Sequence, residues 1–182
     1  SELVQALRVS ARRFAGATMV DQGAGTPVLE TAYQWLKAGH QGSVYAVNAG
    51  TGGSAAYRRN GLAGDTVATF TVRHLAGLRA AQFALRADVP WLAVPETVDA
   101  GPRATEIAVG YARAALAAPG VYVGTVTARN PSDTLAGPLF TLVNTVIVAH
   151  DLGVKALYDE RRGVAPAAVQ RYFLRALQPG AT

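Results

Sequence analysis

The sequence predicts a layered fold of the α+β or α/β class, in which a mixed sheet packs on a central apolar helix. Two observations predict this class. Strand-like and helix-like segments interleave along the 182 residues without strict repetition of βαβ units. Residues 134–152 are apolar on nearly all sides, and a helix of that kind is buried inside a protein. Because we find no internal repeat and no linker, we expect residues 1–182 to form a single compact domain.

The N-terminal part combines two short predicted strands with one well-marked helix. Residues 9–14 and 17–21 are expected to be strands on either side of Ala15-Gly16. The helix should begin after Thr26, because Thr is a good N-cap residue and Pro27 suits the first helical position. Gly39 is expected to end it.

The rest of the chain continues the mixture of strands and helices. The glycine-rich stretch 49–64 is interpreted as a long loop or as a hairpin that turns at Asn60-Gly61. The predicted strands cover residues 44–48, 66–72, 89–94 and 121–128. The predicted helices cover residues 74–87, 102–118, 134–152 and 166–177.

The composition excludes several kinds of chemistry. The chain has no cysteine, so disulfides, thiolate metal sites and thiol catalysis are ruled out. The three histidines, His40, His74 and His150, form no metal-ligand motif, so we expect no metal site. Neither a G-x-S-x-G elbow nor an S-x-x-K motif is present. Few side chains remain for catalysis.

The positive charge is carried by dispersed arginines. The net charge of +5 comes from 17 Lys and Arg against 12 Asp and Glu. Arginine suits a bidentate grip on phosphate or carboxylate, although a GC-rich genome would also explain its excess. No basic run is interleaved with aromatic residues, so we do not expect nucleic-acid binding and favour a small anionic ligand.

No stretch is expected to enter a membrane. The least polar run, residues 135–149, is shorter than the roughly 20 apolar residues that a bilayer requires. The first 14 residues have no apolar signal core. We therefore expect a cytoplasmic protein, although the lack of cysteine would also be tolerated in an oxidising compartment.

The segment that joins the strand 121–128 to the helix 134–152 is the first candidate site. Ligands often bind where a strand ends and a helix begins. One residue there must cap the helix, which is the alternative interpretation, but the segment has more polar groups than one cap needs. These groups are Arg129, Asn130, Ser132, Asp133 and Thr134.

Two further candidates lie at a glycine-rich loop and at a strand end. Backbone N–H groups around Gly52 and Gly53 could hold an anion, although a plain flexible loop is the alternative. Arg73 and His74 end a predicted strand, where His74 could act as a general acid or base or be an ordinary surface histidine.

Three isolated polar residues complete the candidates. Asn144 lies among apolar residues, so it must be hydrogen-bonded within the fold, to a neighbouring subunit or to a ligand in a pocket. Asp21 faces a cleft or caps a turn. Arg103, at a predicted helix start, could meet an anion.

Several segments, in order, resemble methenyltetrahydromethanopterin cyclohydrolases. Residues 15–23 (AGATMVDQG) are similar to an early strand of that family, and residues 71–82 (TVRHLAGLRAAQ) to its T-D-H-P-A segment. Residues 100–104 (AGPRA) resemble its S-G-P-A-R-A motif, and residues 134–137 (TLAG) its S-L-A-G turn. The resemblance implies a hydrolase or lyase of one-carbon metabolism that acts on a pterin substrate without a tightly bound cofactor.

Two differences keep alternatives open. The family's helix after the S-L-A-G turn carries an Arg-x-x-Glu pair, whereas residues 139–145 offer Asn144 and neither Arg nor Glu. Residues 25–33 also resemble a segment of the formaldehyde-activating enzyme of the same pathway, but Met19 stands where that family has its catalytic histidine.

The first hypothesis is therefore a small homo-oligomeric enzyme that acts on a heterocyclic or anionic small molecule. His74, Asp21 or Asp133 would serve catalysis. The expected ligand-holding residues are Arg73, Arg103, Arg129, Asn130, Ser132, Thr134, Asn144, Gly52 and Gly53. The alternative is a non-catalytic ligand-binding or structural subunit that retained the fold. A third hypothesis is an anion-binding or nucleic-acid-binding domain.

Overall fold

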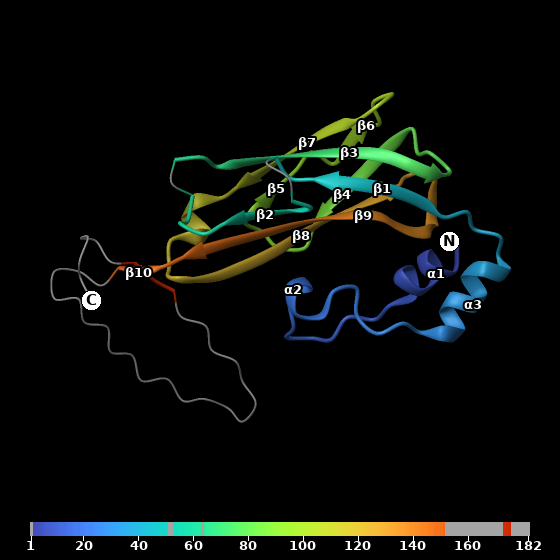
Figure 1. Cartoon of the computed structure of the whole chain (residues 1–182), viewed down its shortest axis with the longest axis horizontal. Helices are drawn as coiled ribbons and strands as arrows, with labels where there is room; N and C mark the ends of the chain where they lie inside the picture. Colours follow the sequence, from blue (N-terminus) through green and yellow to red (C-terminus); the bar gives the residue numbers. More distant parts are fainter. Residues whose placement is uncertain (1, 51–52, 63, 152–172, 176–182) are drawn as a thin grey trace.

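The protein is built around two β-sheets with a short helical segment on one side (Figure 1). The computed structural model describes residues 2–50, 53–62, 64–151 and 173–175. The four-stranded sheet has the order β1 (Ser43–Asn48), β3 (Val67–Gly77), β7 (Thr105–Tyr111), β5 (Leu92–Ala93), and all its pairs are antiparallel. The five-stranded sheet has the order β2 (Ala55–Arg58), β9 (Asp133–Val148), β8 (Gly120–Asn130), β4 (Gln82–Ala87), β6 (Thr97–Asp99).

In the five-stranded sheet, β2 pairs with β9 in parallel, whereas the pairs β9 with β8, β8 with β4 and β4 with β6 are antiparallel. A separate pair joins β10 (His150–Asp151) to β11 (Leu174–Arg175). A 3₁₀ turn, η1 (Arg113–Leu116), follows β7. None of the helices in the described residues is long and apolar enough to cross a bilayer.

The core lies between the two sheets. Strand β7 alternates buried and exposed residues, so that Ile107 and Val109 face inward. Phe83 of β4 and Phe140 of β9 meet edge to face, with ring centroids 5.0 Å apart. Tyr45 of β1 contacts both rings, at 5.5 and 5.4 Å, and so ties the four-stranded sheet to the five-stranded one.

The N-terminal segment, residues 2–40, packs beside β8 and β9 (Figure 1). It contains α1 (Glu2–Ser10), α2 (Met19–Gln22) and α3 (Leu29–Lys37). Its own small core consists of Ala6, Ala32 and Trp35. Two side chains connect it to carbonyls of β9: Trp35 Nε1 donates to Ala136 O at 3.1 Å, and Gln5 Nε2 donates to Pro138 O at 3.2 Å.

The predicted central helix, residues 134–152, is wrong, because this stretch forms β9 and then β10. Strand β9 is apolar on both sides since both of its faces are covered: the successive residues Val146 and Ile147 are 0% and 2% exposed. An apolar run that is buried on both faces looks the same in sequence whether it is helix or strand. Its β-branched residues at 141, 143 and 145–148 favour the strand.

Two other predicted helices are also wrong. Residues 74–87 contain the end of β3 and all of β4, and residues 102–118 contain β7 and η1. Conversely, the strands predicted at 9–14 and 17–21 are absent, because α1 runs to Ser10 and α2 covers Met19–Gln22. At residues 74–87 and 102–118, pairing with strands far along the chain outweighed local spacing. At residues 9–14 and 17–21, local helical turns formed in place of the predicted strands.

Several predicted elements are confirmed. The helix expected after Thr26 is α3, and the strands at 44–48, 66–72 and 121–128 correspond to β1, β3 and β8. The predicted start of α3 is wrong, because the helix begins at Leu29 with Val28 as its N-cap, while Thr26 forms a bridge with Arg12. The strand predicted at 89–94 shrinks to β5. Asn60-Gly61 does not turn a hairpin, because β2 and β3 belong to different sheets. The helix predicted at 166–177 lies outside the described residues except at 173–175, where β11 forms.

The predicted mixed architecture with layered sheets is therefore confirmed, and the described residues are rich in strands. The helices are segregated at the N-terminus and on one side of the sheets, which is the α+β arrangement.

Candidate functional site

A cavity of about 360 Å³ lies between the N-terminal segment and the outer face of β8 and β9. Three arginines line it: Arg8 from α1, Arg13 from the loop after α1, and Arg129 from β8. None of the residues that line it is Asp or Glu. We call this cavity the arginine pocket.

Helix geometry explains how α1 contributes to the arginine pocket. Gln5, Arg8 and Val9 are spaced at i, i+3 and i+4, so they share one face of the helix. That face is turned toward β9, because Gln5 bonds Pro138 and a Cβ at Gly137 would collide with Val9. Arg8 is therefore presented to the sheet.

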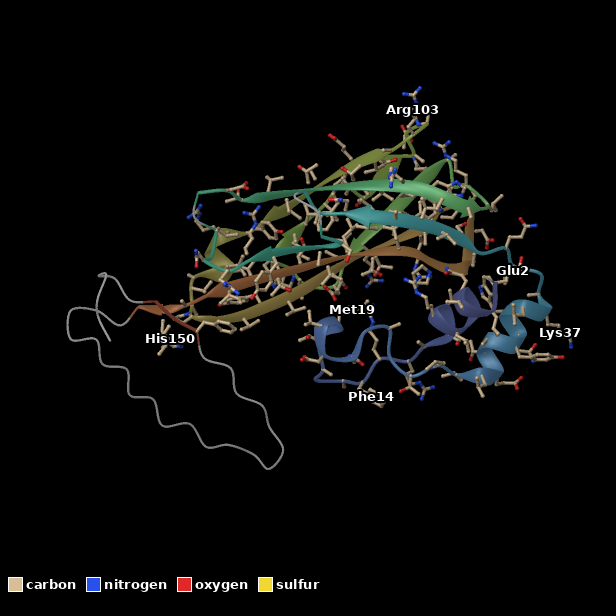
Figure 2. All side chains as sticks on the ribbon, in the orientation of Figure 1. Glu2, Phe14, Met19, Lys37, Arg103 and His150 are labelled. Carbon is tan, nitrogen blue, oxygen red and sulfur yellow. The ribbon has the colours of Figure 1, made fainter. Side chains whose placement is uncertain are left out.

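Arg13 is placed by a closed loop. The backbones of Arg12 and Thr26 exchange two hydrogen bonds, of 2.9 and 3.0 Å, and so close the loop that carries Arg13 and α2. Figure 2 shows Met19 at the part of this loop nearest the sheet and Phe14 on the side away from it. Met19 lines the arginine pocket, whereas Phe14 is exposed.

The sheet side of the pocket supplies polar groups from outward-facing positions. Thr127 and Thr141 are directly paired between β8 and β9, and both line the pocket. Arg129 follows the buried Ala128 and lies at an irregularity in the pairing with β9. None of the three guanidinium groups forms an ion pair with a carboxylate in the described part of the chain. The arrangement concentrates positive charge beside two hydroxyl groups and so favours an anion.

The candidate catalytic residues lie in separate parts of the molecule. His74 is on β3, where its ring meets that of Tyr45 edge-on with centroids 5.2 Å apart. Its Nε2 is buried and has no hydrogen-bond partner in the described residues. Asp21 belongs to α2, where its carboxylate accepts from the hydroxyl of Thr18 at 2.7 Å.

Asp133 opens β9 beside the end of the N-terminal segment. Its Oδ2 lies 3.8 Å from Nδ1 of His40, and its Oδ1 accepts from the backbone N–H of Ala136 at 3.1 Å. The ring of His40 lies 5.6 Å from that of Trp35. This surrounding gives Asp133 a part in holding the segment against β9.

The predicted ligand-holding residues are also dispersed. Arg129 lies in the arginine pocket, but Arg73 faces outward from the other sheet and lines a separate hollow of about 370 Å³ with Asn48 and Gly50. Arg103 lies between β6 and β7, on the opposite side of the molecule from Met19 (Figure 2). The structure therefore does not bring these three arginines together.

The loop expected at 129–134 is a tight turn between β8 and β9. Asn130 pairs with Asp133 across it, and Asn130 Oδ1 accepts from the backbone N–H of Ser132 at 3.1 Å. Thr134 is part of β9. Gly53 forms an isolated bridge with Ala49, while Gly52 lies outside the described residues.

Asn144 is fully buried and has its partners within the fold. Its Oδ1 accepts from the hydroxyl of Tyr111 at 2.9 Å, and its Nδ2 donates to Leu142 O at 3.2 Å. It therefore joins β9 to β7 across the core. It does not line the arginine pocket.

The pKa shifts cluster at this inter-sheet connection. Burial raises the pKa of Tyr111 above its ordinary value, and the neighbouring Arg58 opposes that shift. A hydrogen bond from the N–H of Val67, with help from Arg58, lowers the pKa of Asp65. Partial burial acts to lower the pKa of Arg58, but the hydrogen bond to Asp65 and the neighbouring Tyr111 raise it. Arg58 lies 5.1 Å above the Tyr111 ring and 3.0 Å from Asp65.

The sequence did not reveal Arg8 and Arg13 as site residues. Arg8 could have been found from the i, i+3, i+4 spacing of Gln5, Arg8 and Val9, had residues 2–10 been identified as a helix. Arg13 carried no comparable signal, because only the folded loop brings it to the pocket.

Comparison with known proteins shows a fold likeness alone. No family model and no curated protein matches the chain. Among solved structures, tripeptidyl peptidase 2 (TPP II) superposes with a TM-score of 0.69 at 19% identity, over 82% of this chain. This chain spans only 14% of the TPP II chain. The D00–D0 domain of intimin matches with a TM-score of 0.37 at 13% identity, over 61% of this chain and 49% of that one.

Proposed function

We propose that this chain is a non-catalytic module that binds a small anionic ligand in the arginine pocket. The observation that carries this proposal is the lining: Arg8, Arg13 and Arg129 surround one cavity to which no carboxylate contributes. An anion there would neutralise charges that have no carboxylate partner among the described residues.

The dispersal of the candidate catalytic groups supports the non-catalytic part. General acid–base catalysis requires a group within hydrogen-bond reach of the reacting atoms. His74 and Asp133 do not line the arginine pocket, and neither contacts the other.

The test is a binding assay with a panel of small anions, read by thermal shift and by calorimetry. A ligand present at about 100 times its dissociation constant stabilises the folded state by about 2.7 kcal/mol. We expect this shift to disappear in Arg129→Ala and to shrink in Arg129→Lys, because lysine lacks the bidentate fork. Arg113→Ala, on η1 and outside the pocket lining, is the matched control.

Three results would overturn the proposal. The first is that no anion of the panel shifts the melting temperature. The second is that Arg113→Ala reduces the ligand-induced shift as much as Arg129→Ala does. The third is turnover of a methenyl-pterin that is lost in His74→Ala and Asp133→Ala. Such turnover would establish the enzyme that the sequence resemblance implies.

A further inference from the structure

We propose that the ligand is a small phosphorylated metabolite whose phosphoryl group bridges the N-terminal segment and the five-stranded sheet, so that binding locks the segment in place. This inference rests on the proposed function, since it concerns the same arginine pocket. It adds the class of ligand and the consequence of its binding.

The donor set favours a phosphoryl group over a carboxylate. Each guanidinium offers a fork of parallel N–H donors, and Arg8, Arg13 and Arg129 surround the same cavity. A carboxylate has two oxygens and one negative charge. A phosphoryl group has three strong acceptor oxygens and about −1.5 to −2 charge at neutral pH, which matches three cations better. The hydroxyls of Thr127 and Thr141 add two more donors on the sheet side.

The size of the pocket leaves room for more than the phosphoryl group. An engineered cavity of about 150 Å³ is large enough for benzene. The arginine pocket, at about 360 Å³, could hold a phosphoryl group and a small organic body. Val9 and Met19 supply apolar wall for that body. A compact phosphorylated metabolite therefore fits better than bare phosphate.

The three arginines come from two bodies with separate hydrophobic cores. Arg8 and Arg13 belong to the N-terminal segment, which has a separate core of Ala6, Ala32 and Trp35. Arg129 belongs to the sheet. Among the described residues, Trp35 and Gln5 donate hydrogen bonds to β9, and His40 pairs with Asp133 across the boundary.

Ligand binding and docking of the segment should therefore be coupled. Without an anion, the charges of Arg8 and Arg13 on the segment repel the charge of Arg129 on the sheet, and this repulsion opposes docking. With a phosphoryl group between them, the repulsion becomes attraction to a common partner. A ligand that binds only the docked form must shift the population toward it.

The test measures hydrogen exchange of the full chain with three probes: phenyl phosphate, inorganic phosphate and benzoate. We expect phenyl phosphate to bind most tightly. At about 100 times its dissociation constant it should slow exchange of the α1 and α3 amides by roughly 100-fold. The amides of β7, which belongs to the four-stranded sheet, should keep their exchange rates. Arg129→Ala should abolish the slowing, although it leaves the segment's own sequence intact.

The three probes separate the two proposals. If benzoate binds as tightly as phenyl phosphate, the phosphoryl assignment is wrong while anion binding stands. If phenyl phosphate binds but exchange in α1 and α3 is unchanged, the bridge is wrong and the proposed function survives. If none of the anions binds, both proposals fail. Arg129→Lys controls for misfolding of Arg129→Ala, because it keeps the positive charge and should retain part of the slowing of exchange. Arg113→Ala, outside the pocket, should retain all of the slowing.

Discussion

At the scale of single residues, Asn144 shows how a polar side chain can be buried for a structural purpose. Its amide lies 0% exposed and is bonded to Tyr111 on the opposite sheet. A buried polar group without a partner destabilises a fold, so the pair specifies which residues face each other across the core. Arg58 and Asp65 extend this connection toward the surface.

We predict that Tyr111→Phe lowers the free energy of unfolding by about 1–3 kcal/mol, because Asn144 Oδ1 loses its buried donor. Asn144→Ala should cost at least as much, since it also leaves a cavity. Urea denaturation measures both, with the exposed Asn48→Ala as control. If the double variant loses as much free energy of unfolding as the two single variants together, the side chains of Tyr111 and Asn144 are not coupled and the prediction is wrong.

A second prediction concerns pH. The folded-state pKa of Asp65 lies below its ordinary value of 3.8, so its contribution to stability is present above pH 3.8 and is lost as the pH falls through the lower folded value. Asp65→Asn should be less stable than the wild type at neutral pH, and the difference should narrow in acid. The measurement is urea denaturation across the acid range, with Glu106→Gln, an exposed carboxylate on β7, as control. A constant difference at all pH values would refute the role of its ionisation.

At the scale of elements, the end of β3 depends on a close backbone approach. Gly77 has φ +82°, and a Cβ there would collide with the carbonyl of Gly42. Gly39 also has a positive φ, of +71°, but nothing lies near its would-be Cβ. The two positions therefore separate steric collision from backbone strain.

We predict that Gly39→Ala lowers the free energy of unfolding by about 1–2 kcal/mol, because an alanine in the left-handed conformation is strained by this amount. Gly77→Ala should cost clearly more, because the backbone of Gly42 must also move. Gly120→Ala, whose nearest neighbour would be 3.8 Å away at a flexible ring, is the control and should be nearly neutral. If Gly39→Ala and Gly77→Ala lower the free energy of unfolding equally, the backbone of Gly42 moves away from the new Cβ at no energetic cost, and the prediction is wrong.

At the scale of the whole molecule, the sandwich formed by the two sheets and the N-terminal segment have separate hydrophobic clusters. The larger cluster draws on both sheets, while the smaller one holds three residues. A unit with few buried contacts opens at lower free energy than the core to which it is attached. The segment is therefore expected to open before the sheets unfold.

We predict that Ala32→Asp, which places a carboxylate at a position only 3% exposed, releases the segment and leaves the sandwich folded. Hydrogen exchange should become fast in α1 and α3 while β7 and β8 stay protected. Thr31→Asp, at the neighbouring exposed position of α3, should change neither. Loss of protection in β7 together with α3 would show that the molecule unfolds as one unit.

The sequence by itself determined the elements whose signals are local. The helical spacing of α3, the left-handed Gly39 after it and the β-branched residues of β1, β3 and β8 predicted these elements, because these local preferences agree with the final fold. Its dispersed arginines also favoured a small anionic ligand, which stays a proposal. The expectations of a pterin substrate, a homo-oligomer and a cytoplasmic location stay predictions too.

Only the tertiary structure decided the rest, because it depends on which surfaces become covered. The residues of β9 are as apolar as a buried helix. They form a strand because β8 and β2 pair with its two edges, while β1 of the other sheet and α1 of the N-terminal segment pack against it. Arg8, Arg13 and Arg129 are separated by up to 121 residues of sequence and share a pocket only after the N-terminal segment docks. Local periodicity carries no information on such long-range pairing, and this is why the fold class could be predicted in outline while the candidate site could not.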